Sequence, residues 1–326
     1  MKQQQFEQQF AAQWREFAKW LDQLEASPHR RHAECIDFPA RYRTLCGHYA
    51  MARERRYSSS LVDQLQQLVR RGQGQLYRHR GQWLWRLARF VSHGFPAAIR
   101  RQAGPFWLAC ALFWLPAIVI GLATYADSDR IYMVTDRVTV AQMESMYDPD
   151  SDHPGRSEER ASDSDFYMFG FYVYNNVGIG FRTFAGGILF GLGSVFFLLF
   201  NGLHIGAIAG HLTGMGYITT FWGFVAGHSA LELMAICISG AAGLVLGRAL
   251  LMPGPYRRLT ALRLAAASAI ELMLGAMLML FMAAFVEAFW SSTSAVPAAV
   301  KYTVGIVLWL LLAGYFLFLG RRHESG

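Results

Sequence analysis

Charged residues are scarce in this sequence. Only 16% of its 326 residues are charged, whereas 53% are hydrophobic. The 65 residues from Thr183 to Gly247 contain a single charged side chain, Glu232. An ordinary soluble domain has about 25% charged residues. The composition therefore excludes a typical soluble protein of this size and predicts a membrane protein.

Motifs for soluble catalysis are also missing. His228 and Glu232 lie four residues apart, but the segment lacks the second histidine of a His-Glu-x-x-His metalloprotease helix, so an intramembrane hydrolase is disfavoured. There is no Walker-type loop and no Gly-x-Ser-x-Gly elbow. The four cysteines show no metal-type spacing, and we expect free thiols at Cys35, Cys46, Cys110 and Cys237. The sequence thus predicts no enzyme, no metal site and no cofactor.

No apolar segment opens the chain, so we expect the first spanning helix to direct insertion. Residues 1–104 contain 18 Lys or Arg and 8 Asp or Glu. Basic patches bind nucleic acid in some proteins. In a membrane protein, however, a basic bias confined to one region marks the cytoplasmic side. We therefore expect contact with the headgroups of the lipid bilayer and no nucleic-acid partner.

The first 80 residues predict a cytoplasmic helical domain. Apolar residues recur at helical steps of three and four at Phe6, Phe10, Trp14, Phe17, Leu21 and Leu24. Two further helices are expected near 40–56 and 59–77, so the simplest arrangement is a small bundle; binding of a partner by the first helix is the alternative. Residues 81–104 mix aromatic side chains with arginines, which is typical of an amphipathic helix at the membrane interface.

A transmembrane domain is expected over residues 105–320, followed by a cytoplasmic tail, 321–326. Residues 105–125 carry no charge and are long enough to cross a hydrocarbon core of about 30 Å. Residues 126–165 contain 11 acidic and 4 basic side chains, which predicts a solvated extracytoplasmic loop. A divalent-cation site is the alternative there, but no calcium-loop spacing is present.

The remaining crossings depend on where the arginines between 248 and 263 lie. To keep that loop cytoplasmic, we place 166–182 at the outer interface and predict three crossings, near 184–202, 204–224 and 228–248. Two more follow at 262–289 and 302–319. The predicted fold is an all-α, polytopic membrane helix bundle of six spans, with five spans and a re-entrant segment as the alternative.

Glycines spaced four apart predict close helix packing. Such residues open one face of a helix to a neighbouring backbone. The longest set forms a glycine ladder at Gly202, Gly206, Gly210 and Gly214, and shorter sets lie at Gly187, Gly191, Gly243 and Gly247. The ladder could pack within one chain or across a dimer interface, and both remain open; for the protein as a whole we expect a homo-oligomer.

Polar side chains inside the apolar segments are the candidate site. An ionised side chain at mid-membrane costs about 2.5–3.5 kcal/mol on insertion scales, so it usually faces the protein interior and has a partner. The candidates are His228, Glu232, His204, His211, Glu271 and Glu287. One interpretation is a buried pair of His228 and Glu232 that fixes helix packing. The other is a polar site for transport, proton coupling or lipid-headgroup contact.

The order of several short motifs resembles a known family. These motifs are Asn175-Asn176, Phe184-Ala185-Gly186-Gly187-Ile188, Asn201-Gly202, Gly227-His228 with Glu232, Gly240-Ala241-Ala242-Gly243 and Glu287-Ala288-Phe289. Over about residues 90–320 they resemble the stage II sporulation protein M family, in particular its larger, non-sporulating branch. The resemblance singles out Asn175, Asn176, Asn201, His228, Glu232 and Glu287. Gly227 stands where the family commonly has proline.

The resemblance implies a bacterial inner (cytoplasmic) membrane protein. Its implied role is a scaffold or assembly factor of a cell-envelope complex, with other envelope proteins or a MoxR-type ATPase as partners. The alternative function is a transporter, channel or lipid-handling protein with an intramembrane polar site around Glu232 and His228.

Overall fold

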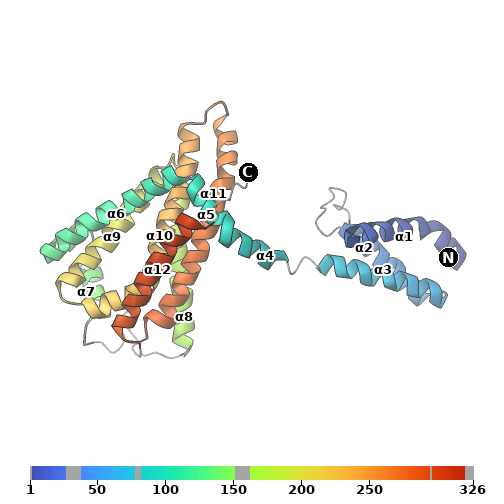
Figure 1. The fold of residues 1–326 in the computed structure, drawn as a ribbon, viewed down its shortest axis with the longest axis horizontal. Coiled ribbons are helices and arrows are strands. Elements are labelled where there is room, and N and C mark those ends of the chain that lie inside the picture. The colour runs from blue at the N-terminus through green and yellow to red at the C-terminus, as the bar shows by residue number, and fades with distance from the viewer. Residues whose placement is uncertain (1, 27–37, 78–81, 151–161, 294–295, 320–326) are drawn as a thin grey trace. The chain divides into compact units, whose positions relative to one another are not determined.

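The computed structural model describes residues 2–26, 38–77, 82–150, 162–293 and 296–319. Every regular element in these ranges is a helix, which confirms the predicted all-α fold (Figure 1). The chain divides into two compact units, Met1–Ala88 and Arg89–Gly326.

The N-terminal unit is the predicted small helical bundle. It contains α1 (Gln3–Ala26), α2 (Phe38–Glu54) and α3 (Ser59–Tyr77). Its buried core consists of Phe6, Trp14, Phe17, Leu21, Phe38, Leu45, Ala52, Leu61, Leu65 and Leu68. Within this core Trp14 Nε1 donates a hydrogen bond to His48 Nδ1 at 3.1 Å, and burial lowers the pKa of His48. The apolar stripe of α1 is therefore used for folding.

Residues 82–101 form two short helices. α4 (Gln82–Arg89) is followed by a π-helical turn, Phe90–Gly94, and by α5 (Phe95–Arg101). The helix expected over 81–104 thus contains a π-turn and ends at Arg101. At the end of α5, Arg100 Nη1 donates to the carbonyl of Phe316 at 2.7 Å, and Arg101 Nη2 lies 2.5 Å from Glu271 Oε2. Both arginines thus attach α5 to the bundle.

Five helices in the described ranges are long and apolar enough to cross a membrane. They are α6 (Ala103–Ala126), α9 (Leu192–Gly214), α10 (Ile218–Leu251), α11 (Arg258–Val286) with the π-helical turn η6 (Glu287–Ser291), and α12 (Ala298–Phe318). The predicted crossings at 105–125, 262–289 and 302–319 correspond to α6, α11 and α12.

Residues 166–182, predicted at the outer interface, form a helix that is not among the five long, apolar ones. These residues belong to α8 (Ser162–Ala185), which packs against α10 and α11. The Phe166 ring contacts Phe289, beyond the C-terminal end of α11, at a centroid distance of 5.5 Å. Phe190, just after α8, lies 6.0 Å from the Arg258 guanidinium at the other end of α11. α8 and its turn therefore run the length of α11. Helical periodicity cannot tell a polar face turned to water from one turned to protein.

The three crossings predicted between 184 and 248 are wrong, because the structure forms two helices there, α9 and α10. Residues 186–191 make a reversal in which Gly191 has φ +85°, a conformation that favours glycine. α10 alone has 34 residues and is about 51 Å long at about 1.5 Å per residue. The described part of the bundle therefore has five helices with the length and hydropathy of a membrane crossing, and α8 packs beside two of them.

The acidic segment after α6 is partly folded. It contains η4 (Ser128–Met133) and α7 (Arg137–Met146), and the side chains of Ile131 and Val140 are buried. Asp136 caps α7 by accepting hydrogen bonds from the backbone N–H groups of Thr139 and Val138 and from the Thr139 hydroxyl. These hydrogen bonds lower the pKa of the Asp136 carboxyl. The predicted loop 126–165 ends earlier than expected, since α8 begins at Ser162.

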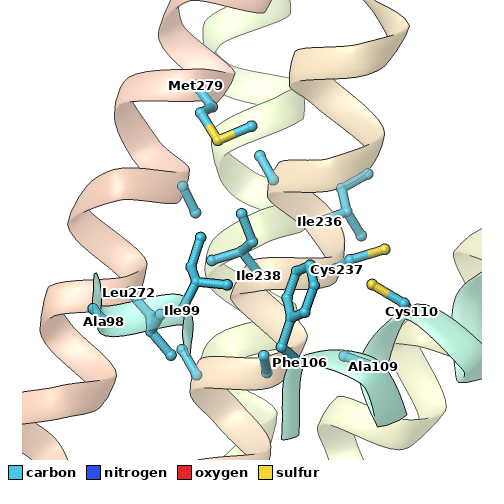
Figure 2. Close-up of a cluster of buried hydrophobic side chains, with 14 of the residues drawn as sticks. Ala98, Ile99, Phe106, Ala109, Cys110, Ile236, Cys237, Ile238, Leu272 and Met279 are labelled. Carbon is cyan, nitrogen blue, oxygen red and sulfur yellow. The ribbon is translucent and has the colours of Figure 1, made fainter. Parts of the chain in front are cut away.

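The core of the membrane unit combines side chains of α5, α6, α10 and α11, among them Ala98 and Ile99 of α5 and the Phe106 ring (Figure 2). The sulfur atoms of Cys110 and Cys237 lie near one another in this view. Cys46, Cys110 and Cys237 are free cysteines as predicted, whereas Cys35 lies outside the described residues.

The glycines of α9 bring its backbone against α6 of the same chain. A Cβ atom on Gly202, Gly206 or Gly210 would lie 2.0–2.3 Å from a backbone carbonyl oxygen of α6, and one on Gly214 would lie 3.1 Å from the Tyr125 oxygen. Of the two arrangements left open for these residues, the structure has the one within the chain. Any side chain at the first three positions would push the two helices apart.

Gly187 and Gly191 make close contacts from a turn, although their spacing suggested a helix. A Cβ on Gly187 would lie 2.1 Å from the Gly243 oxygen, and a Cβ on Gly247 would lie 2.4 Å from Gly191 Cα. The reversal between α8 and α9 therefore packs directly on the backbone of α10.

Candidate intramembrane polar site

α10 and the π-helical turn η6 bring three candidate residues together. His228 and Glu232 lie one turn apart on α10 and share a face. Glu287 is the first residue of η6. One ligand-type atom from each of these residues lies within 4.8 Å of the other two. We call these three side chains the His–Glu–Glu cluster.

Hydrogen bonds orient two members of the cluster. His228 Nδ1 lies 3.0 Å from Ser291 Oγ, also in η6. Asn176 Nδ2 of α8 donates to Glu287 Oε2 at 3.2 Å, and Asn175 Nδ2 donates to Asn176 Oδ1 at 3.1 Å. α8 therefore supplies the amides that hold Glu287.

His228 and Glu232 of α10 are close to one another but are not hydrogen-bonded. His228 Nε2 lies 3.6 Å from Glu232 Oε2. This distance exceeds the range of about 2.7–3.2 Å for an N–H···O hydrogen bond. His228 is 4% exposed and Glu287 is 9% exposed, whereas the Glu232 side chain is 17% exposed, so two of the three members are buried.

Close packing at Gly227 sets the approach of η6 to α10. A Cβ on Gly227 would lie 2.3 Å from the Trp290 ring and 3.2 Å from Ser291 Oγ. Gly227 lies inside α10, which begins at Ile218, and not just before a helix as the predicted crossing at 228–248 placed it. The π-turn η6 ends this helix and presents Glu287 and Ser291 to α10.

Two residues near the cluster were missed by sequence reasoning. Buried Lys301 donates from Nζ to the backbone oxygen of Ser291 at 2.7 Å. Burial raises the pKa of Tyr147, as do the nearby charges of Glu287 and Glu232, so its phenol stays protonated. Lys301 could have been found from the sequence, because a lysine at the start of an apolar run is unusual. Nothing in the local sequence indicated that Tyr147 lies near the cluster.

The other candidates lie elsewhere. His211 contacts the folded acidic segment through Glu144 Oε1 at 2.8 Å and Ser128 Oγ at 2.7 Å. His204 stacks on Phe200 at a centroid distance of 6.0 Å and lines a hollow of about 550 Å³ with residues of η4. Glu271 pairs with Arg101.

Asn201 completes the set, and its Nδ2 donates to the Phe197 carbonyl within α9 at 2.7 Å. The motif residues suggested by the resemblance therefore divide into two groups. Asn175, Asn176, His228, Glu232 and Glu287 form one connected group, and Asn201 lies apart.

A comparison with models of protein families gave two matches. The model of stage II sporulation protein M matches residues 109–292, which is more than half of the chain. The chain belongs to this family. The matched range contains the whole His–Glu–Glu cluster and both asparagines, whereas Lys301 lies beyond it.

The N-terminal unit has a separate match. A family described as a domain of unknown function (DUF8413) matches residues 4–78, which coincide with α1 to α3. No curated protein and no solved structure gave a match. This stage II sporulation protein M family member thus joins a membrane bundle of its family to a distinct helical unit.

Proposed function

We propose that this protein is a scaffold or assembly factor of a bacterial cell-envelope complex, in the inner membrane with its N-terminus in the cytoplasm. The observation that carries the proposal is the combination of a backbone-packed membrane bundle with a second unit that has its own core. The three contacts at Gly202, Gly206 and Gly210 leave no side-chain space between α6 and α9. Such packing suits an anchor that holds a recognition unit at the membrane.

The basic content of the N-terminal region supports the cytoplasmic orientation, because Lys and Arg are retained on that side. The proposed partners are other envelope proteins or a MoxR-type ATPase, bound through the N-terminal unit. A homo-oligomer is part of the proposal and is tested by the mass of the purified complex.

Cross-linking in native membranes tests this role. The full chain and a chain starting at residue 89 are each purified after cross-linking, with an unrelated multi-pass protein as the control. We expect the full chain to enrich a MoxR-type ATPase or envelope proteins, and the shortened chain to lose them. Glu232→Gln is expected to keep them. Equal recovery by the full chain and the control would reject the scaffold role.

A transporter, channel or lipid-handling protein is the second candidate. The His–Glu–Glu cluster favours it, because buried ionisable groups in membrane helices often mark substrate or proton pathways. Flux of protons, metal ions and labelled lipid is measured in liposomes from pH 5 to 8, with Glu232→Gln as the test variant. Flux that is lost in this variant supports transport, and the absence of any flux by the wild type rejects it.

A further inference from the structure

We infer that His228, Glu232 and Glu287 bind one divalent transition-metal cation of the Zn²⁺ class. This inference goes beyond both proposed functions and holds whether the protein is a scaffold or a transporter. It also differs from the prediction of no metal site, which rested on the absence of sequence motifs.

The donor set suits such an ion. One imidazole nitrogen and two carboxylate oxygens are ligands that Zn²⁺ accepts, and three protein ligands leave a fourth position for water. Ca²⁺ and Mg²⁺ prefer oxygen donors alone. The imidazole of His228 therefore favours a transition metal over these two ions.

The spacing suits it as well. The donors of one tetrahedral zinc lie about 3.3–3.5 Å apart, given Zn–N and Zn–O bonds of about 2.0–2.2 Å. His228 Nε2 and Glu232 Oε2 are 3.6 Å apart, too long for a hydrogen bond and close to this value. The donors of all three residues lie within 4.8 Å, so small side-chain rotations bring Glu287 to the same ion.

The surroundings orient the donors. When His228 Nδ1–H donates to Ser291 Oγ, the lone pair of Nε2 faces Glu232. Metal-binding histidines usually have such a partner on the other ring nitrogen. Asn176 Nδ2 holds Oε2 of Glu287 in the same way.

Charge provides a further argument. Two carboxylates held within a few ångströms in a buried site repel one another unless a cation or a proton lies between them. Lys301 supplies one positive charge nearby and donates a hydrogen bond from Nζ to the Ser291 carbonyl, and a single positive charge cannot offset two carboxylates. A metal ion would neutralise the carboxylates and tie α10 to the end of α11. A shared proton is the competing occupant.

Metal binding to the full chain in lipid nanodiscs tests the inference. After treatment with a chelator, the protein is titrated with Zn²⁺ and with Co²⁺, and bound metal is measured by mass spectrometry and by the visible absorption of Co²⁺. We expect about one ion per chain and a rise in Tm on binding. Mg²⁺ and Ca²⁺ are expected to give neither effect at equal concentration.

Matched variants locate the ion. His228→Gln, Glu232→Gln and Glu287→Gln are expected to abolish the Co²⁺ absorption, while His204→Gln and Glu271→Gln, which change the same residue types elsewhere in the bundle, keep it. Asn176→Ala touches no metal ligand directly and is expected to weaken binding about 10- to 100-fold, so it tests the site even if a cluster variant fails to fold. Stoichiometric binding that persists in folded Glu232→Gln, or no binding by the wild type, overturns the inference and leaves the shared proton.

Discussion

A single methyl group at Gly206 should separate two helices of the bundle. In Gly206→Ala, the new Cβ would lie 2.2 Å from the Ala117 oxygen, 2.7 Å from its Cα and 2.8 Å from its carbonyl carbon. All three neighbours are backbone atoms, so no side chain can rotate away. A carbon–oxygen contact normally lies at about 3.3 Å or more, so α9 and α6 must move apart by about 1 Å.

The expected cost follows from this movement. Overpacking a tight core typically costs about 1–3 kcal/mol. With a Tm change of about 2–4 °C per kcal/mol for a unit of this size, Gly206→Ala should lower Tm by about 2–12 °C. Gly170→Ala is the matched control, because a Cβ at Gly170 in α8 has no atom within 4 Å. Removing that helical glycine should leave stability unchanged or raise it by up to about 1 kcal/mol.

Thermal unfolding of wild type and both variants, in one detergent and followed by tryptophan fluorescence, measures the difference. A Gly206→Ala variant as stable as Gly170→Ala would refute the close contact between α6 and α9.

Three further predictions concern other parts of the chain. On a cysteine-free background, Leu189→Cys should react with a membrane-impermeant maleimide only from the cytoplasmic side, and Met215→Cys only from outside. The reason is that α9 runs between the two positions as one crossing. Reaction of Leu189→Cys from outside would restore the three-crossing arrangement. Burial lowers the pKa of His48 below its usual 6.5, so the unfolded chain binds more protons as the pH falls through about 6.5. The free energy of unfolding of a fragment of residues 1–80 should therefore be highest above that pH and decrease from pH 7.5 to 5.5. His48→Gln, which keeps an acceptor for Trp14, should flatten the dependence of Tm on pH. An unchanged slope in this variant would contradict the role of His48. Glu271→Gln should lower the free energy of unfolding, measured by chemical denaturation, by no more than about 1 kcal/mol, because the Glu271 and Arg101 side chains are 31% and 56% exposed. A loss several times larger would show that this ion pair is buried in the lipid-embedded protein.

Local patterns were sufficient for much of the architecture. The stripe from Phe6 to Leu24 predicted α1 because an amphipathic helix has the same period whatever it packs against. The uncharged run of 105–125 predicted α6 because its length matches the hydrocarbon core. His228 and Glu232 were recognisable as neighbours, since four residues make about one helical turn.

The sequence by itself thus determined that this is a membrane protein of helices, with a helical N-terminal domain and a polar pair on one helix face. Only the tertiary structure decided what that pair contacts. Glu287 reaches His228 from a separate helix, through a π-turn that no local pattern encodes, and Asn176 reaches Glu287 from α8. Those contacts join residues 59 or more positions apart, and they depend on how α8, α10 and η6 pack. The single charge of the long apolar run is therefore one member of a cluster of three ionisable side chains.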